Sequence, residues 1–150
     1  MTPSEANGHQ HRTSDKPAGA PPRAVRVGQA ARFALAGIRV INGGLALIAP
    51  GVIIERFDEQ PSDSAATYAL RMFGVRTVVL GVDLVALSGE PLRRALGQAV
   101  IIHGTDTATA AALGVSGRVR PRTAIPLTLI SLTNTALAIT AYLAARRDEK

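Results

Sequence analysis

The feature that most constrains this chain is a long apolar run near its C-terminal end that carries no charged residue. It covers residues 124–145 and reads AIPLTLISLTNTALAITAYLAA. A helix needs about 20 apolar residues to cross the hydrocarbon core of a bilayer. Three earlier apolar segments of similar length lie at residues 33–54, 65–87 and 92–114. The pattern therefore predicts an all-α fold, a four-helix transmembrane bundle with one span in each segment.

Residues 1–31 differ from the rest of the chain. They are rich in Pro, Gly, Ser, His, Lys and Arg and contain few large apolar side chains, a composition typical of disorder. The sequence thus predicts two parts, a disordered basic tail at residues 1–31 and a membrane bundle at residues 32–147. No short hydrophobic region with a cleavage site precedes Phe33, so the first segment is predicted to be an uncleaved signal anchor.

Proline and serine mark the expected helix ends. Ser64 can cap the second helix, and Pro91 suits the first turn of the third, where a missing N–H costs little. Pro126 is expected in the first turn of the fourth helix for the same reason. Pro50 lies late in the first segment and is expected to bend that helix or end it early.

Basic residues predict the orientation in the membrane. The N-terminal tail, the C-terminus and the connection after the second segment are basic, whereas residues 55–64 after the first segment are acidic. Lys and Arg accumulate in cytoplasmic loops, so both termini are predicted to be cytoplasmic. Three arginines between the last two segments oppose this, Arg118, Arg120 and Arg122. A re-entrant third segment would move them inside, so both topologies stay open there.

Six ionisable residues fall inside the predicted spans, and each costs roughly 2.5–3.5 kcal/mol at the bilayer centre unless it faces protein or water. They are Arg39, Arg71, Arg76, Asp83, His103 and Asp106. Depth along each helix, counted at about 1.5 Å per residue from its predicted cytoplasmic end, decides which of them can meet. Arg39 and Asp83 come out about 9 Å and about 6 Å deep, which predicts an ion pair between them.

A second group lies near the middle of the bilayer. Arg76, His103 and Asn134 come out about 16 Å deep, and Asp106 about 21 Å deep. His103 and Asp106 are three residues apart, so they share a helix face. Arg76, His103, Asp106 and Asn134 therefore form a candidate intramembrane polar site. Small residues allow helices to approach closely enough for such contacts, chiefly Gly43, Gly44, Gly74, Gly81 and Gly104.

Composition removes several functional classes. The chain has no cysteine, which excludes disulfides, thiolate metal sites and thiol catalysis. Aromatic residues make up 3% with no Trp, so the stacking platforms of single-stranded nucleic-acid binders are missing. The net charge of +6 therefore indicates contact with anionic lipid headgroups and a role in orienting the spans in the membrane. The predicted partner is the lipid bilayer and not nucleic acid, with room for a homo-oligomer or a partner membrane protein.

Catalytic and phosphate-binding motifs do not occur in a supporting context. The chain is thus predicted not to be an enzyme and to carry no cofactor or metal. One functional hypothesis is a non-enzymatic accessory or structural membrane protein whose buried Arg–Asp and His pairs fix the register of the helices. The alternative is a small transporter or channel that uses the mid-membrane polar site, where His103 could relay protons.

Short motifs in the spans resemble those of a known family. They are RMFGVR followed by LG at residues 71–81, HGTD at residues 103–106, and a first span in which Arg39 precedes GG and AP. The chain resembles a family of small, uncharacterised, actinobacterial-type four-helix integral membrane proteins, a domain of unknown function. The resemblance covers residues 32–145. It implies a four-helix fold, a location in the bacterial cytoplasmic (cell) membrane, and a shared motif that includes Arg76, His103 and Asp106.

Overall fold

The computed structural model describes residues 22–55 and 64–147 and shows an all-helical protein. In chain order the helices are α1 (Arg23–Ile48), α2 (Pro50–Ile54), α3 (Ser64–Ala86), α4 (Gly89–Val115) and α5 (Pro121–Arg147). No strand occurs in the described part of the chain. The predicted all-α class is therefore confirmed.

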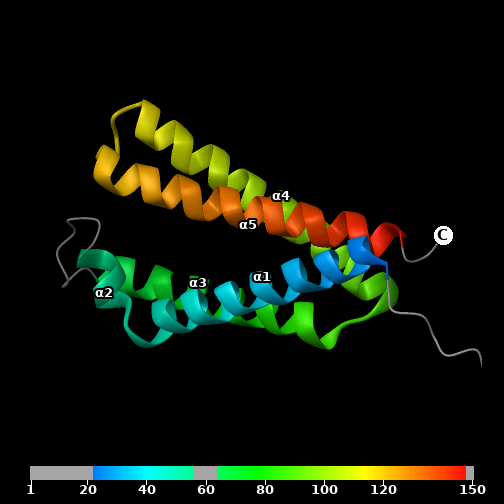
Figure 1. Ribbon diagram of the computed structural model, residues 1–150. Helices are drawn as coiled ribbons and strands as arrows, with labels where there is room; N and C mark the ends of the chain where they lie inside the picture. The colour runs from blue at the N-terminus through cyan, green and yellow to red at the C-terminus, as the bar shows by residue number, and fades with distance from the viewer. Residues whose placement is uncertain (1–21, 56–63, 148–150) are drawn as a thin grey trace, which may run out of the picture.

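The four long helices form two hairpins. α1 packs along α3, α4 packs along α5, and α1 with α5 joins the two hairpins, whereas α3 and α4 have little contact. Figure 1 shows the hairpins together where α1 begins and α5 ends, which we call the closed end. They lie apart toward α2 and the turn at residues 116–120, which we call the open end.

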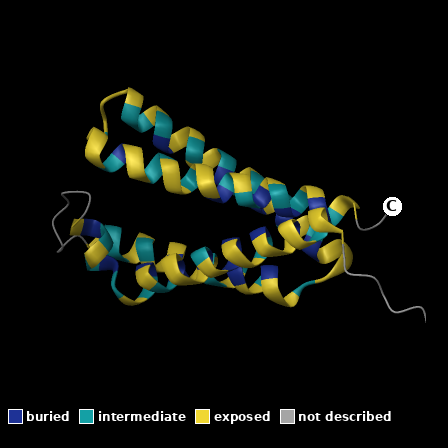
Figure 2. Ribbon diagram, in the orientation of Figure 1, coloured by how far each residue is buried: buried dark blue, intermediate teal, exposed yellow. Residues whose placement is uncertain are grey.

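A core of small and medium-sized side chains fills the closed end. Leu35 of α1, Leu84 of α3 and Leu96 of α4 are almost fully buried there. Alanines surround these leucines, namely Ala31, Ala36, Ala99, Ala138 and Ala141. Because alanine lets helix backbones approach closely, all four long helices meet at this end. Figure 2 shows the buried positions facing inward between the helices and the exposed positions on the outer faces.

Arg32 fastens α1 to the last turn of α3 at the closed end. Its guanidinium donates hydrogen bonds to the carbonyl oxygens of Leu84, of Val85 at 3.1 Å and of Leu87 at 2.9 Å. Carbonyls at a helix C-terminus lack partners inside the helix, and a cation there also interacts favourably with the helix dipole. The sequence indicated only a positive charge beside a span, so this role comes from the structure.

Glycine sets the distance between α1 and α3. A Cβ atom on Gly43 would lie 2.8 Å from the carbonyl oxygen of Gly74, and one on Gly74 would lie 2.6 Å from the carbonyl oxygen of Gly43. The two backbones are therefore in direct contact. Gly81 is also close to α1, since its Cβ would lie 3.1 Å from the Cβ of Arg39. Gly44 and Gly104 face open space instead, so only part of the predicted small-residue set brings helices together.

The start of α1 corrects the predicted tail. The helix begins at Arg23, so residues 23–31 are helical, whereas the composition predicted a disordered segment to residue 31. The physical reason is tertiary packing, because Gly28 is buried against Ala144 of α5, and packing stabilises helices more than local propensity does. Residues 1–21 of the predicted tail lie outside the described residues.

Prolines lie at helix ends in two of the three places where the sequence predicted them. Ala49 leaves helical geometry and Pro50 starts α2, so the early end of α1 is confirmed. Pro91 lies in the first turn of α4, as predicted. Pro126 was placed in the wrong turn, because α5 begins at Pro121, and Pro126 lies inside the helix.

Two of the helices, α1 and α5, are long and apolar enough to cross a membrane. α3 and α4 do not meet the same criterion, and charged residues interrupt the apolar stretches of both. Length and composition thus give weak support to membrane association in general. The four-span bundle stays a prediction.

Gly43→Val should disturb the contact between α1 and α3, because the added methyl groups would occupy the space of the α3 backbone. Overpacking of this kind costs roughly 1–3 kcal/mol. We expect less monodisperse protein in detergent and a lower midpoint of thermal unfolding. Gly44→Val is the matched control, since that glycine faces open space. Equal losses for both variants would contradict the contact.

Candidate functional site

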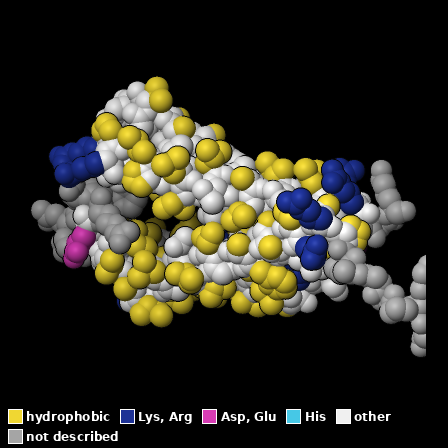
Figure 3. Space-filling view, in the orientation of Figure 1, with side chains coloured by type: hydrophobic (Ala, Val, Ile, Leu, Met, Phe, Trp, Pro, Cys, Tyr) yellow, Lys and Arg dark blue, Asp and Glu magenta, His cyan; other side chains and the backbone are white. Residues whose placement is uncertain are grey.

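A cavity of about 710 Å³ lies between the two hairpins toward the open end. Figure 3 shows the molecular surface hollowed between the hairpins at this end. Apolar atoms make up most of the lining surface, although only eight of the eighteen lining residues are apolar, namely Ile38, Leu45, Ile53, Leu70, Phe73, Pro126, Leu127 and Ile130. The volume is within the range of small-molecule sites, about 300–1,000 Å³. The cavity is therefore large enough for a ligand and apolar enough to favour one that dissolves in lipid.

The polar lining residues are ordered along the cavity. Its wall on α5 runs from Arg122 to Asn134, and its wall on α1 runs from Ile38 toward α2. Arg39 and Asn134 therefore lie at the inner end, next to the closed end of the bundle. Arg122 lies at the outer end.

Arg39 and His103 join the two hairpins at the inner end of the cavity. Arg39 Nε donates a hydrogen bond of 3.0 Å to His103 Nε2. Both residues are almost fully buried, with exposed fractions of 3% and 7%. Arginine carries only hydrogen-bond donors, so His103 Nε2 must be the acceptor and the ring proton sits on Nδ1. The imidazole is therefore neutral in this arrangement.

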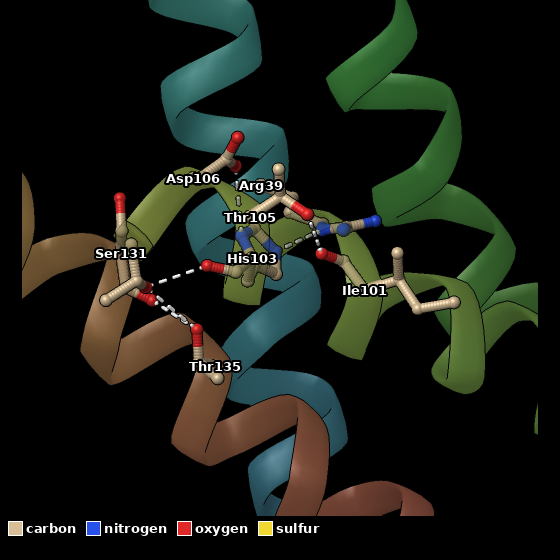
Figure 4. A network of polar contacts seen from close by, with 8 residues as sticks. Arg39, Ile101, His103, Thr105, Asp106, Ser131 and Thr135 are labelled. Carbon is tan, nitrogen blue, oxygen red and sulfur yellow. Dashed lines mark hydrogen bonds and ion pairs between the residues drawn. The ribbon is translucent and has the colours of Figure 1, made fainter. Parts of the chain in front are cut away.

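Asp106 lies on the other side of the His103 ring. His103 Nδ1 is 3.6 Å from Asp106 Oδ2, and Figure 4 shows the ring linked to both Arg39 and Asp106. The Asp106 side chain is 48% exposed and also lines the cavity. The positive charge of Arg39 and the negative charge of Asp106 thus flank a neutral imidazole. The three side chains together carry no net charge.

Asn134 of α5 is a buried polar side chain at the same inner end. Its exposed fraction is 7%, and its Oδ1 has no hydrogen-bond partner among the described residues. A buried polar atom without a partner costs about 1–3 kcal/mol. Asn134 lines the cavity, but its Oδ1 is closed off from the empty cavity, so the amide has to turn before this oxygen can bind a group that enters there.

Threonines fix the register of α4 against α5 beside the site. Thr107 Oγ1 and Thr135 Oγ1 are 3.0 Å apart across the two helices. Each hydroxyl also lies within hydrogen-bond distance of a carbonyl of its own helix, Thr107 of the His103 carbonyl at 2.7 Å and Thr135 of the Ser131 carbonyl at 2.9 Å. A hydroxyl has a single hydrogen, so one threonine donates across the two helices while the other donates within its own. These contacts, drawn in Figure 4, hold the helices that carry His103 and Asn134 in a fixed relation.

Three of the four residues predicted for the polar site line this cavity, His103, Asp106 and Asn134. Arg76 does not, because it is exposed on the face of α3 that also carries Met72 and Val79. Arg39 takes the place predicted for Arg76.

The predicted pair of Arg39 with Asp83 is replaced by the contact of Arg39 with His103. Arg39 and Asp83 lie at similar heights, as the depth count predicted, because Gly81 is beside Arg39 and Asp83 is only two residues further along α3. Two residues turn a helix by about 200°, so the side chain of Asp83 lies on another face of α3 than Gly81. The predicted pair therefore fails on the rotation of the helices and not on depth.

Within residues 22–55 and 64–147 no group of three or more metal-binding side chains comes together. The described part of the site thus offers hydrogen bonds and charge.

No protein-family model, curated protein or solved structure matches the chain. The resemblance to small four-helix membrane proteins therefore stays a prediction.

His103→Leu should remove the acceptor of Arg39 and leave a buried guanidinium without its partner. An uncompensated buried charge costs roughly 3–5 kcal/mol, so we expect a large fall in the unfolding midpoint. Arg39→Met in the same chain should recover part of the loss, because the unpaired charge is gone. Strictly additive losses in this double-mutant cycle would contradict the contact. Arg76→Met is the control and should change little, since Arg76 is exposed.

Proposed function

We propose that the chain is a non-enzymatic, multi-pass protein of the bacterial cytoplasmic membrane, with α1, α3, α4 and α5 as its spans. Support comes from the surface, where large apolar side chains such as Ile41, Met72 and Leu129 are exposed. In Figure 3 apolar side chains cover the middle of the molecule, and basic side chains lie near its two ends. A bilayer around the middle would cover the apolar surface, while the basic ends would reach the headgroups.

The length of α4 supports a spanning third segment over a re-entrant one. α4 is one continuous helix of 27 residues, about 40 Å long, which exceeds the roughly 30 Å of hydrocarbon. In the proposed orientation both termini and the closed end are cytoplasmic. The open end with Arg118, Arg120 and Arg122 then faces outward, and these three arginines are an exception to the charge rule.

Single cysteines can test this orientation, because the chain has none of its own. Ser116→Cys lies after α4, at the open end, and should react with a membrane-impermeant maleimide in intact cells. Ser88→Cys lies between α3 and α4 and should react only after the membrane is opened. Both positions are exposed, so access to the reagent decides the result. The reverse pattern would contradict the orientation, and labelling of both in intact cells would contradict the four-span topology.

For this membrane protein we propose a binding function, in which the cavity holds a lipid-soluble ligand that has a polar head. One observation carries the proposal. The apolar cavity ends at Asn134, whose buried oxygen has no partner among the described residues. Buried polar atoms in proteins nearly always have a partner. A ligand in the cavity can supply it once the Asn134 amide turns toward the cavity.

The two earlier hypotheses account for less of the site. A purely structural role accounts for the contact between Arg39 and His103 but not for Asn134. A channel would need a path through the closed end, where Leu35, Leu84 and Leu96 are packed together. A binding protein with a cavity open toward one end agrees with both the polar residues and the packed core.

Leu127→Trp should fill the cavity, since Leu127 lines it. We expect wild-type protein purified in mild detergent to retain an amphiphilic molecule and the variant to retain much less of it. Mass spectrometry of lipid extracts from the purified proteins measures the difference.

The matched control is Leu129→Trp, which adds the same ring to an exposed position of α5. Equal retention by Leu127→Trp and Leu129→Trp would contradict binding in the cavity. A wild-type protein that retains no such molecule would contradict the proposed function.

A further inference from the structure

The inner end of the cavity also indicates the chemistry of the ligand, an inference that rests on the proposed binding function. Arg39 uses its Nε for His103, and its terminal nitrogens make no hydrogen bond to any other described residue. Because Arg39 lines the cavity, these N–H groups are available to a ligand. Asn134 offers the opposite character, a buried acceptor at Oδ1. A complementary polar head group of the ligand therefore accepts a hydrogen bond from Arg39 and donates one to Asn134.

Charge decides between charged and neutral heads. The positive charge of Arg39 is already balanced by Asp106, which lies across the His103 ring and lines the same cavity. An anionic head would add a second negative charge near Asp106, and a cationic head would add a second positive charge near Arg39. Unbalanced charge is costly in surroundings of low dielectric constant. A neutral head leaves the balance unchanged.

We infer that the cavity binds a neutral, lipid-soluble alcohol. A hydroxyl group accepts a hydrogen bond through its oxygen and donates one through its hydrogen, so one small group can pair with Arg39 and, once the Asn134 amide turns toward the cavity, with Asn134 as well. An ether or ketone accepts from Arg39 but leaves Asn134 without a donor. The apolar body of the alcohol lies against the apolar wall toward Leu127 and Phe73.

The full-length protein in detergent tests this inference with probes that share one alkyl chain. Scintillation-proximity binding of tritiated 1-tetradecanol is measured against unlabelled 1-tetradecanol, 1-methoxytetradecane, tetradecanoate and tetradecyltrimethylammonium. We expect saturable binding of the alcohol. The ether and both charged probes should compete at least roughly ten-fold more weakly, because each leaves a polar group unpaired or a charge unbalanced.

The variant Asn134→Leu shows whether Asn134 is the acceptor. It keeps the approximate size of the side chain and should erase the preference for the alcohol over the ether. Thr133→Leu is the matched control on the exposed face of the same helix and should keep that preference. If Asn134→Leu does not fold, the competition series on the wild-type protein still decides between neutral and charged heads.

Each of the other outcomes overturns a defined part of the inference. If tetradecanoate competes as well as the alcohol, the neutral head is wrong, while the proposed binding function stands. If Asn134→Leu keeps the preference for the alcohol over the ether, the assigned contact is wrong. If no probe binds saturably, the inference fails, and the comparison of Leu127→Trp with Leu129→Trp then decides separately whether the cavity binds a ligand at all.

Discussion

The hydrogen bond between Arg39 and His103 is the contact on which the site depends, because it joins one helical hairpin to the other. α1 brings Arg39 from the first hairpin, and α4 brings His103 from the second. α3 and α4 follow each other in the chain but have little contact. The hairpins are thus held together by α1 with α5 and by this polar pair. A buried guanidinium that left the ring would lose its partner in apolar surroundings, so the pair fixes where the hairpins begin to separate.

The cavity follows from the difference in side-chain size between the two ends of the bundle. At the closed end Gly28 packs against Ala144, and alanines let all four long helices meet. Toward the open end Gly43 and Gly74 still hold α1 against α3, but larger residues such as Phe73 face the space between the hairpins. Each hairpin therefore stays intact while the two diverge. The hollow forms between them, next to the polar pair.

Much of the fold could be predicted from the sequence, because apolar runs and prolines are local signals. The spacing of His103 and Asp106 likewise placed both on one face of a helix. The arginine beside them could not be identified, since the face that each helix turns toward its neighbours depends on packing between helices. On α3 it is Gly81 and not Asp83 that lies against Arg39, and spacing along one helix does not record this rotation. The cavity depends on the angle between two hairpins, which no local pattern records.

Asn134 and the Arg39–His103 pair make opposite contributions to the stability of the fold. The pair stabilises the folded protein, whereas the Asn134 oxygen lowers its stability, and we assign that residue to ligand binding. Arg39 has its partner inside the protein, so it stabilises the closed arrangement whether or not a ligand is bound. The oxygen of Asn134 has none among the described residues, and an apolar side chain of similar size would avoid the cost of burying it. Natural proteins accept such a cost where function requires it. Under the proposed binding function, this amide would weaken the empty protein and strengthen the loaded one, which would make occupancy itself a source of stability.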